Sequence, residues 1–182
     1  MINAMKVEVL FRESIKPSSP TPHHLRTFNL SFLDQIAPPI YVPLIFFYAS
    51  DGDGNNKMEA CRRDVLKKSL SEILTRYYPL SGRIKEDSFI IDCNDDGVDY
   101  LEARVHNNCR PVSEFIQHPD VHLLKQFLPF DPCGSESSSE FDFESGFNSK
   151  VLLAVQVSFF DCGGMAIGVC ISHKMQMQMH LH

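Results

Sequence analysis

The chain has 182 residues, of which 43% are hydrophobic and 22% are charged, so it can bury one sizeable core but not two comfortable domains. Its formal net charge of −6 disfavours the basic surface that would neutralise nucleic-acid phosphates or anionic lipid. No apolar run approaches the roughly 20 residues needed to cross a bilayer, and charged side chains interrupt residues 1–11. We therefore expect one cytoplasmic α/β domain with neither a nucleic-acid nor a membrane partner.

The first third of the chain predicts two strands separated by loops. Residues 6–12 alternate apolar and charged side chains with the period of a half-buried strand, and the proline- and serine-containing residues 17–22 predict a loop. The β-branched and aromatic run at residues 41–49 predicts the second strand. Residues 51–56, DGDGNN, lack the downstream ligand of a calcium loop, so a surface loop is expected there.

The clearest helix is predicted at residues 58–78. Apolar side chains recur there at three- and four-residue steps, and Pro79 ends the pattern. Three short strands are expected next, at residues 83–86, 88–93 and 100–105.

The last third predicts a short helix, a polar loop and a hairpin. Pro111 is tolerated in a first helical turn and favours a helix over residues 112–117, whereas the acidic, serine-rich residues 135–146 predict an exposed loop. Two apolar runs, at residues 150–160 and 165–172, flank a Gly-Gly turn and predict a buried hairpin.

His173 directly follows this hairpin and is the candidate catalytic residue. A strand-to-loop exit can place an imidazole in a cleft, and an ordinary pKa near ~6.5 lets histidine accept a proton at neutral pH. From the residues alone, a strand-end histidine that bonds to backbone is the simpler interpretation. No Gly-rich phosphate loop follows a strand, which disfavours nucleotide binding.

Four separated blocks change that balance: LSxxDQ at residues 30–35, YYPLSGR at 77–83, FDCGG at 160–164 and SHK at 172–174. Together they resemble the BAHD family of plant acyl-CoA-dependent acyltransferases, and the segments IYVPLIFFY and FLPFDP look most similar to its alkaloid-acylating branch. The resemblance implies a chloramphenicol-acetyltransferase-like α/β fold, a mixed sheet flanked by helices. Residues 1–174 would form the N-terminal one of the two family domains.

The resemblance also implies a reaction. The histidine of an HxxxD motif removes a proton from an acceptor hydroxyl or amine, which attacks the thioester carbonyl of acyl-CoA, and His173 matches that histidine. Such general-base catalysis needs no serine or cysteine nucleophile. It implies acyl-CoA, with acetyl as the expected group, as co-substrate, no bound cofactor, and an alcohol such as an indole alkaloid as acceptor.

The chain departs from the family pattern near its end. Met177 stands where the motif places an aspartate, within the atypical tail of residues 175–182, MQMQMHLH. The resemblance assigns that aspartate an ionic contact that holds the loop, which methionine cannot make. The DFGWG motif and the C-terminal domain are absent, so we expect a truncated chain whose site lacks one wall, admits water and is inactive alone.

A noncatalytic role stays open beside this interpretation. The missing half would expose an apolar interdomain face, through which the chain could pair with itself or with an intact acyltransferase, and poor solubility is expected. Asp34 and Arg83 could look catalytic in isolation, but an ion pair or a turn anchor explains them as well, so neither is a predicted site residue.

No metal site is expected. His180 and His182, or His23 and His24, could bind a metal, but chain ends are usually mobile and no second-shell carboxylate lies nearby. The six cysteines include no CxxC pair and are expected to be buried free thiols.

Overall fold

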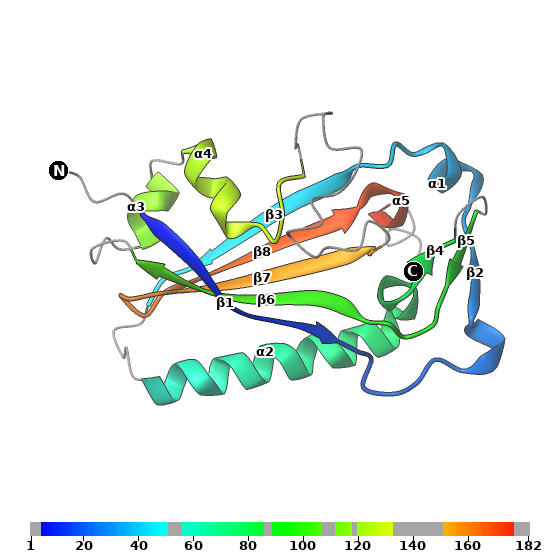
Figure 1. Cartoon of the computed structure of the whole chain (residues 1–182), viewed down its shortest axis with the longest axis horizontal. Helices are drawn as coiled ribbons and strands as arrows, with labels where there is room; N and C mark the ends of the chain where they lie inside the picture. The colour runs from blue at the N-terminus through cyan, green and yellow to red at the C-terminus, as the bar shows by residue number, and fades with distance from the viewer. Residues whose placement is uncertain are drawn as a thin grey trace.

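A computed structural model describes residues 5–50, 56–85, 89–106, 112–117, 120–132 and 151–176. A five-stranded sheet has the order β1-β6-β7-β8-β3, and a separate three-stranded sheet has the order β2-β5-β4 (Figure 1). In the larger sheet β6 and β7 run parallel, while the other three pairs are antiparallel. The predicted mixed sheet flanked by helices is confirmed.

The strands are β1 (Lys6–Ile15), β2 (Thr27–Asn29), β3 (Tyr41–Tyr48), β4 (Arg83–Ile84), β5 (Ile90–Asp92), β6 (Val98–His106), β7 (Leu153–Phe160) and β8 (Met165–Ser172). The α-helices are α1 (Phe32–Ile36), α2 (Asn56–Arg76), α3 (Val112–Gln117), α4 (Val121–Leu124) and α5 (His173–Gln176). Three 3₁₀ turns are η1 (His23–Leu25), η2 (Tyr78–Ser81) and η3 (Lys125–Phe127).

Each predicted element has a counterpart, with shifted ends. The long helix stops at Arg76 rather than residue 78, because Tyr77 leaves helical geometry at φ −107° and ψ 53° and Pro79 lies in the following 3₁₀ turn. The strand predicted at residues 83–86 is only two residues long. The sequence-based prediction missed β2, α1, α4 and α5, all of five residues or fewer.

Helix α2 covers the part of the sheet formed by β6 and β7. Leu66, Leu70 and Leu74 pack there against strand residues that include Tyr100 and Val157. The opposite face carries a second core, in which Phe127 of η3 stacks on Phe160 at 5.6 Å between ring centroids. The sheet is therefore sandwiched where β6 and β7 run through it.

Residues 125–130, called the crossing segment below, pass directly over β8. A Cβ atom on Gly168 would lie 1.9 Å from the carbonyl oxygen of Phe127, so only glycine fits beneath this segment. The Gln156 side-chain amide donates a hydrogen bond of 2.9 Å to the Gln126 carbonyl. The FLPFDP block thus begins in a segment held flat against the sheet.

Several sequence-based predictions lie wholly or mainly outside the described residues. These are the loops at 51–56 and 135–146 and the tail at 175–182, with Met177, His180 and His182. Among the cysteines described, Cys93 and Cys170 are buried as expected, but the prediction is wrong for Cys61, which is exposed on α2. Within the described residues, no helix is long and apolar enough to cross a membrane.

Candidate functional site

His173 lies where three strands end. It begins α5 directly after β8, and its backbone N–H donates a hydrogen bond of 2.9 Å to the Ile40 carbonyl, just before β3. The preceding residue, Ser172, donates its N–H to the Leu152 carbonyl at 2.9 Å, just before β7. The hairpin therefore delivers the histidine to an end of the sheet, as its position in the sequence predicts.

The two ring nitrogens of His173 have different surroundings. The side chain as a whole is half-buried, whereas Nδ1 is buried and has no hydrogen-bond partner among the described residues. A neutral imidazole has one protonated and one free nitrogen, so a base acting through Nε2 must carry its proton on Nδ1. The acceptor that would hold that tautomer is not supplied by the described part of the chain.

The LSxxDQ block builds α1, which contacts α5 beside the histidine. Asp34 is fully buried, and its Oδ2 accepts a hydrogen bond of 3.0 Å from the Ser31 N–H, while its own N–H donates to Ser31 Oγ at 3.3 Å. This reciprocal pair is a capping box, which satisfies the free amides of the first helical turn. Asp34 thus caps helix α1, a structural role different from the ion pair or turn anchor considered from the sequence.

Tyr41 starts β3 and pairs with Ser172 of β8. Its side chain lies on the face of the sheet that carries the crossing segment. Its hydroxyl donates a hydrogen bond of 2.6 Å to the Val151 carbonyl, and its ring meets Phe130 of the crossing segment edge-on at 4.8 Å. Burial raises the pKa of Tyr41 to about 12, so the phenol stays protonated near neutral pH. It positions the strand end rather than serving as a base.

The YYPLSGR block anchors a turn whose Arg83 forms a β-bridge with Val151. Arg83 Nη1 donates hydrogen bonds of 2.8 Å to the carbonyls of Gly82 and Gly97, and the Gly97 N–H donates to the Ser81 carbonyl at 3.0 Å. Gly97 has φ +92°, and a Cβ atom there would lie 2.6 Å from the Ile15 carbonyl oxygen. Arg83 is therefore a turn anchor, as predicted.

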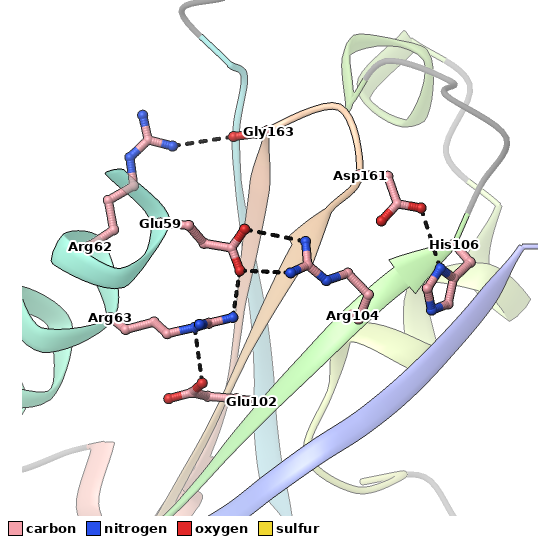
Figure 2. A network of polar contacts seen from close by, with 8 residues as sticks. All are labelled: Glu59, Arg62, Arg63, Glu102, Arg104, His106, Asp161 and Gly163. Carbon is pink, nitrogen blue, oxygen red and sulfur yellow. Dashed lines mark hydrogen bonds and ion pairs between the residues drawn. The ribbon is translucent and has the colours of Figure 1, made fainter. Parts of the chain in front are cut away.

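The FDCGG block forms the tight turn of the β7–β8 hairpin. The Phe160 N–H donates to the Gly164 carbonyl and the Gly163 N–H donates to the Phe160 carbonyl, both at 2.9 Å, with φ +86° at Gly163. Arg62 of α2 also donates to the Gly163 carbonyl, at 3.2 Å (Figure 2). The helix thus holds the turn at the end of the hairpin opposite His173.

A second cluster of ionisable residues, called the ionic cluster below, lies between α2 and the sheet (Figure 2). Glu102 is 2% exposed and contacts Arg63 at 3.1 Å and Lys67 at 2.5 Å, while Glu59 bonds to Arg63 and Arg104. Lys67 also reaches Glu13 of β1 at 2.6 Å. Three carboxylates face three cations, so the geometry indicates a structural network rather than an acid or base.

Sequence reasoning missed the ionic cluster, although its signal is visible in retrospect. Glu59, Arg63 and Lys67 are spaced four residues apart on one face of the helix, and Glu102 and Arg104 alternate on β6. Burial lowers the pKa of Lys67, but its hydrogen bonds to Glu102 and Glu13 outweigh burial and raise it to about 12.

No metal centre competes with His173 in the described part of the chain. No group of three or more His, Cys, Asp or Glu side chains there could hold a metal ion. An open pocket of about 350 Å³ lies between β3 and the α4–η3 segment, lined mainly by apolar residues that include Ile45 and Leu128. Its polar lining is Lys125 and Asp131, which pair with each other at 2.9 Å.

Known proteins resemble this chain in sequence and in structure. The family described as Transferase family matches residues 5–177. Stemmadenine O-acetyltransferase from Catharanthus roseus is 48% identical over 94% of the chain, and a limonoid 21-O-acetyltransferase from Melia azedarach is 44% identical over 93%. The crystal structure of vinorine synthase matches 93% of the chain with a TM-score of 0.73 and 40% identity.

These matches cover only part of the larger proteins. The chain spans 38% of the stemmadenine enzyme, 36% of the limonoid enzyme and 38% of the vinorine synthase chain. The α/β arrangement described here corresponds to that matched portion.

Proposed function

The chain belongs to the BAHD acyltransferase family, and on that premise we propose that it contributes the catalytic base to the transfer of an acetyl group from acetyl-CoA to a hydroxyl. The proposed acceptor is an alcohol of a plant specialised metabolite, such as an indole alkaloid. Relatives whose names specify O-acetylation support the acyl group and the acceptor atom. The observation that carries the proposal is the half-buried His173 at the end of β8, within the matched region.

In the proposed step, Nε2 of His173 accepts the proton of the acceptor hydroxyl while that oxygen bonds to the thioester carbonyl carbon. The tetrahedral intermediate then collapses, the carbon–sulfur bond breaks, and the sulfur of CoA takes the proton from the imidazolium. Holding both substrates beside one base makes the attack effectively unimolecular, so no acyl-enzyme is needed. Acyl-CoA is a co-substrate in this scheme, not a bound cofactor.

We propose that the 182-residue chain does not complete this site by itself. The buried Nδ1 of His173 has no acceptor among the described residues, although the reactive tautomer needs one. The side chains of Phe32, Leu33 and Ile36 on the neighbouring helix α1 are also exposed, so water reaches that side. A second polypeptide wall would supply the acceptor and exclude water.

The test is a chimera in which residues 5–176 replace the matching portion of vinorine synthase. Thiol release from acetyl-CoA is measured with a panel of alkaloid alcohols, beside the chain alone. We expect turnover from the chimera and none from the chain. In the chimera, His173→Ala should lower the rate by roughly 10²–10⁴-fold, the usual contribution of a general base.

A matched control replaces another histidine that no proposed step uses. His122 lies exposed on α4, and the chimera carrying His122→Ala should keep its rate. If the His173→Ala chimera retained its rate, another group would be the base and the assignment would be wrong. Turnover by the chain alone would contradict the proposed need for a second wall.

The second candidate function is noncatalytic pairing, either with another copy of this chain or with an intact acyltransferase. The observation in its favour is the run of exposed apolar side chains on β3. A chain that stays folded, shows no turnover in the chimera and self-associates would favour this function over the first.

A further inference from the structure

The backbone at the candidate base is held from two different strands. The N–H of His173 donates to the Ile40 carbonyl, and the N–H of Ser172 donates to the Leu152 carbonyl, both at 2.9 Å. Ile40 directly precedes β3 and Leu152 directly precedes β7, and β8 lies between these two strands in the sheet (Figure 1). The position of the His173 backbone therefore depends on how far apart the beginnings of β3 and β7 lie.

The side chain of Tyr41 links the beginnings of the same two strands. Tyr41 is the first residue of β3 and pairs with Ser172, the last residue of β8. Its hydroxyl donates a hydrogen bond of 2.6 Å to the carbonyl of Val151, two residues before β7. Because β8 lies between β3 and β7, this bond spans the end of β8. It thus sets the separation of the two segments that hold Ser172 and His173.

The acceptor of this bond is itself held in place. Val151 is only 3% exposed and forms a β-bridge with Arg83. The guanidinium of Arg83 in turn donates hydrogen bonds of 2.8 Å to the carbonyls of Gly82 and Gly97. Tyr41 is therefore bonded to a fixed point of the turn that Arg83 anchors, and the bond carries that position across to β3.

The ring that carries the donor is supported by the crossing segment. Phe130 meets the Tyr41 ring edge-on, and the thiol of Cys170 donates to the Phe130 carbonyl at 3.9 Å. The same segment is held to β7 by the bond from the Gln156 amide to the Gln126 carbonyl. Edge-to-face contacts between rings do not need the hydroxyl. Removing only that group would therefore leave the ring in place and break only the bond to Val151.

The hydroxyl also keeps its proton where a histidine base works. Burial raises the pKa of Tyr41 to about 12, whereas a histidine exchanges its proton near neutral pH. The donor is therefore present throughout the pH range in which the proposed base acts. Its own titration does not enter the pH dependence of the reaction.

We propose that Tyr41 is a positioning residue for His173: its bond to Val151 across β8 fixes the two strand beginnings that hold the histidine backbone. Tyr41 touches neither substrate in this scheme and acts only through the backbone. A misplaced base slows the chemical step without weakening substrate binding, so the effect falls on kcat rather than on KM. The effect on rate rests on the proposed role of His173, whereas the hold on the backbone does not.

The first test is amide hydrogen exchange, followed by NMR, in the 182-residue chain and its Tyr41→Phe variant. The reference is the N–H of Phe160, which donates to the Gly164 carbonyl at the other end of the hairpin. Relative to that amide, the N–H groups of Ser172 and His173 should exchange about three- to tenfold faster in the variant, the range that one hydrogen bond is worth. Equal acceleration of all three amides would indicate a general loss of stability and overturn the proposal.

Two matched variants separate the hydrogen bond from the ring. Replacing Tyr41 by 4-aminophenylalanine keeps the ring and a donor, and should bring both exchange rates back to within about twofold of the original chain. Tyr100→Phe removes a buried hydroxyl that has no hydrogen-bond partner among the described residues, so the ratio to Phe160 should not change. An unchanged ratio in Tyr41→Phe, or no recovery with the amine, would overturn the proposal.

The second test measures rates in the chimera described above. Tyr41→Phe should lower kcat about three- to tenfold and leave the KM for the acceptor unchanged. A raised KM with an unchanged kcat would make Tyr41 a substrate-binding residue and contradict the positioning role. If the exchange results are as expected but His173→Ala keeps the rate of the chimera, the proposed base is wrong and the hold of Tyr41 on this backbone stands.

Discussion

The two halves of α2 are attached to the same sheet by different chemistry. The half near its N-terminus is held by the ionic cluster, in which Arg63 reaches the buried Glu102 (Figure 2). Lys67 reaches the same carboxylate. The other half places Leu70 and Leu74 against the core, with Leu74 fully buried. Charge therefore gives way to apolar packing within one helix.

The two kinds of contact have different effects on α2: one stabilises its attachment to the sheet, and the other determines its orientation. Removing apolar area from water stabilises the fold by about 25 cal/mol per Å², without directional preference. Buried charges lose hydration that their attraction only partly repays, yet leaving one without its partner is costly. The apolar half therefore supplies most of the attachment energy, and the ionic half fixes how α2 lies along β6.

The largest loss of stability is expected when a buried side chain in the apolar half of α2 is truncated. Leu74→Ala leaves a cavity in the core and should lower the free energy of unfolding by about 3–4 kcal/mol, measured by urea denaturation. The neighbouring Ile73 is half-exposed, so Ile73→Ala should cost under about 1 kcal/mol. Equal losses in the two variants would show that burial does not distinguish the two helix positions.

A smaller loss is expected in the ionic half. Glu102→Gln keeps the shape but leaves Arg63 and Lys67 without their shared charge, which should cost about 2–3 kcal/mol in the same denaturation assay. As the control, Glu72→Gln removes only an exposed ion pair with Lys68 at 4.0 Å and should cost under about 0.5 kcal/mol. If Glu102→Gln left the free energy of unfolding unchanged, the ionic cluster would not be what holds α2 along β6.

The smallest effect concerns Tyr100, at the junction of the two halves. Its hydroxyl is buried and has no hydrogen-bond partner among the described residues. Removing an unsatisfied polar group should stabilise the fold, so Tyr100→Phe should gain up to about 1 kcal/mol at pH 7. A loss of stability would indicate that the hydroxyl has a partner in solution.

Tyr100 also makes the stability of the fold depend on pH. Burial, with a contribution from Glu102, raises the pKa of Tyr100 to about 12, and the pKa of Lys67 is also about 12. Both groups hold their protons more tightly when folded than their ordinary pKa values near ~10 allow, so stability falls as pH rises from about 10 to 12. Tyr100→Phe should reduce that alkaline loss, measured by denaturation at pH 7, 9 and 11.

How well the sequence predicted each element follows from how local its cause is. The periodicity of α2 and the two apolar runs around Gly163 and Gly164 lie within short windows, so the helix and the hairpin were predicted close to their observed bounds. Helix α1 depends on one capping box over five residues, which is too short for a periodic signal. The position of His173 followed directly from the predicted hairpin.

The missed features depend on residues far apart in the chain. Glu59 meets Arg104 across 45 positions, and Gln126 meets Gln156 across 30, so neither contact leaves a local pattern. Gly168 illustrates the same point, because its need for glycine comes from the carbonyl of Phe127 above it. That Nδ1 of His173 finds no acceptor among the described residues likewise has no signature in the sequence.

The parallel pairing of β6 and β7 has a consequence for the order of folding. The β7–β8 hairpin closes over a tight turn, whereas Asp99 of β6 must find Ala154 of β7, 55 residues later. Because closing a long loop costs entropy before its contacts form, pairings of high contact order slow folding. We therefore expect the hairpin that ends at His173 to form early, and the rest of the larger sheet to assemble on it.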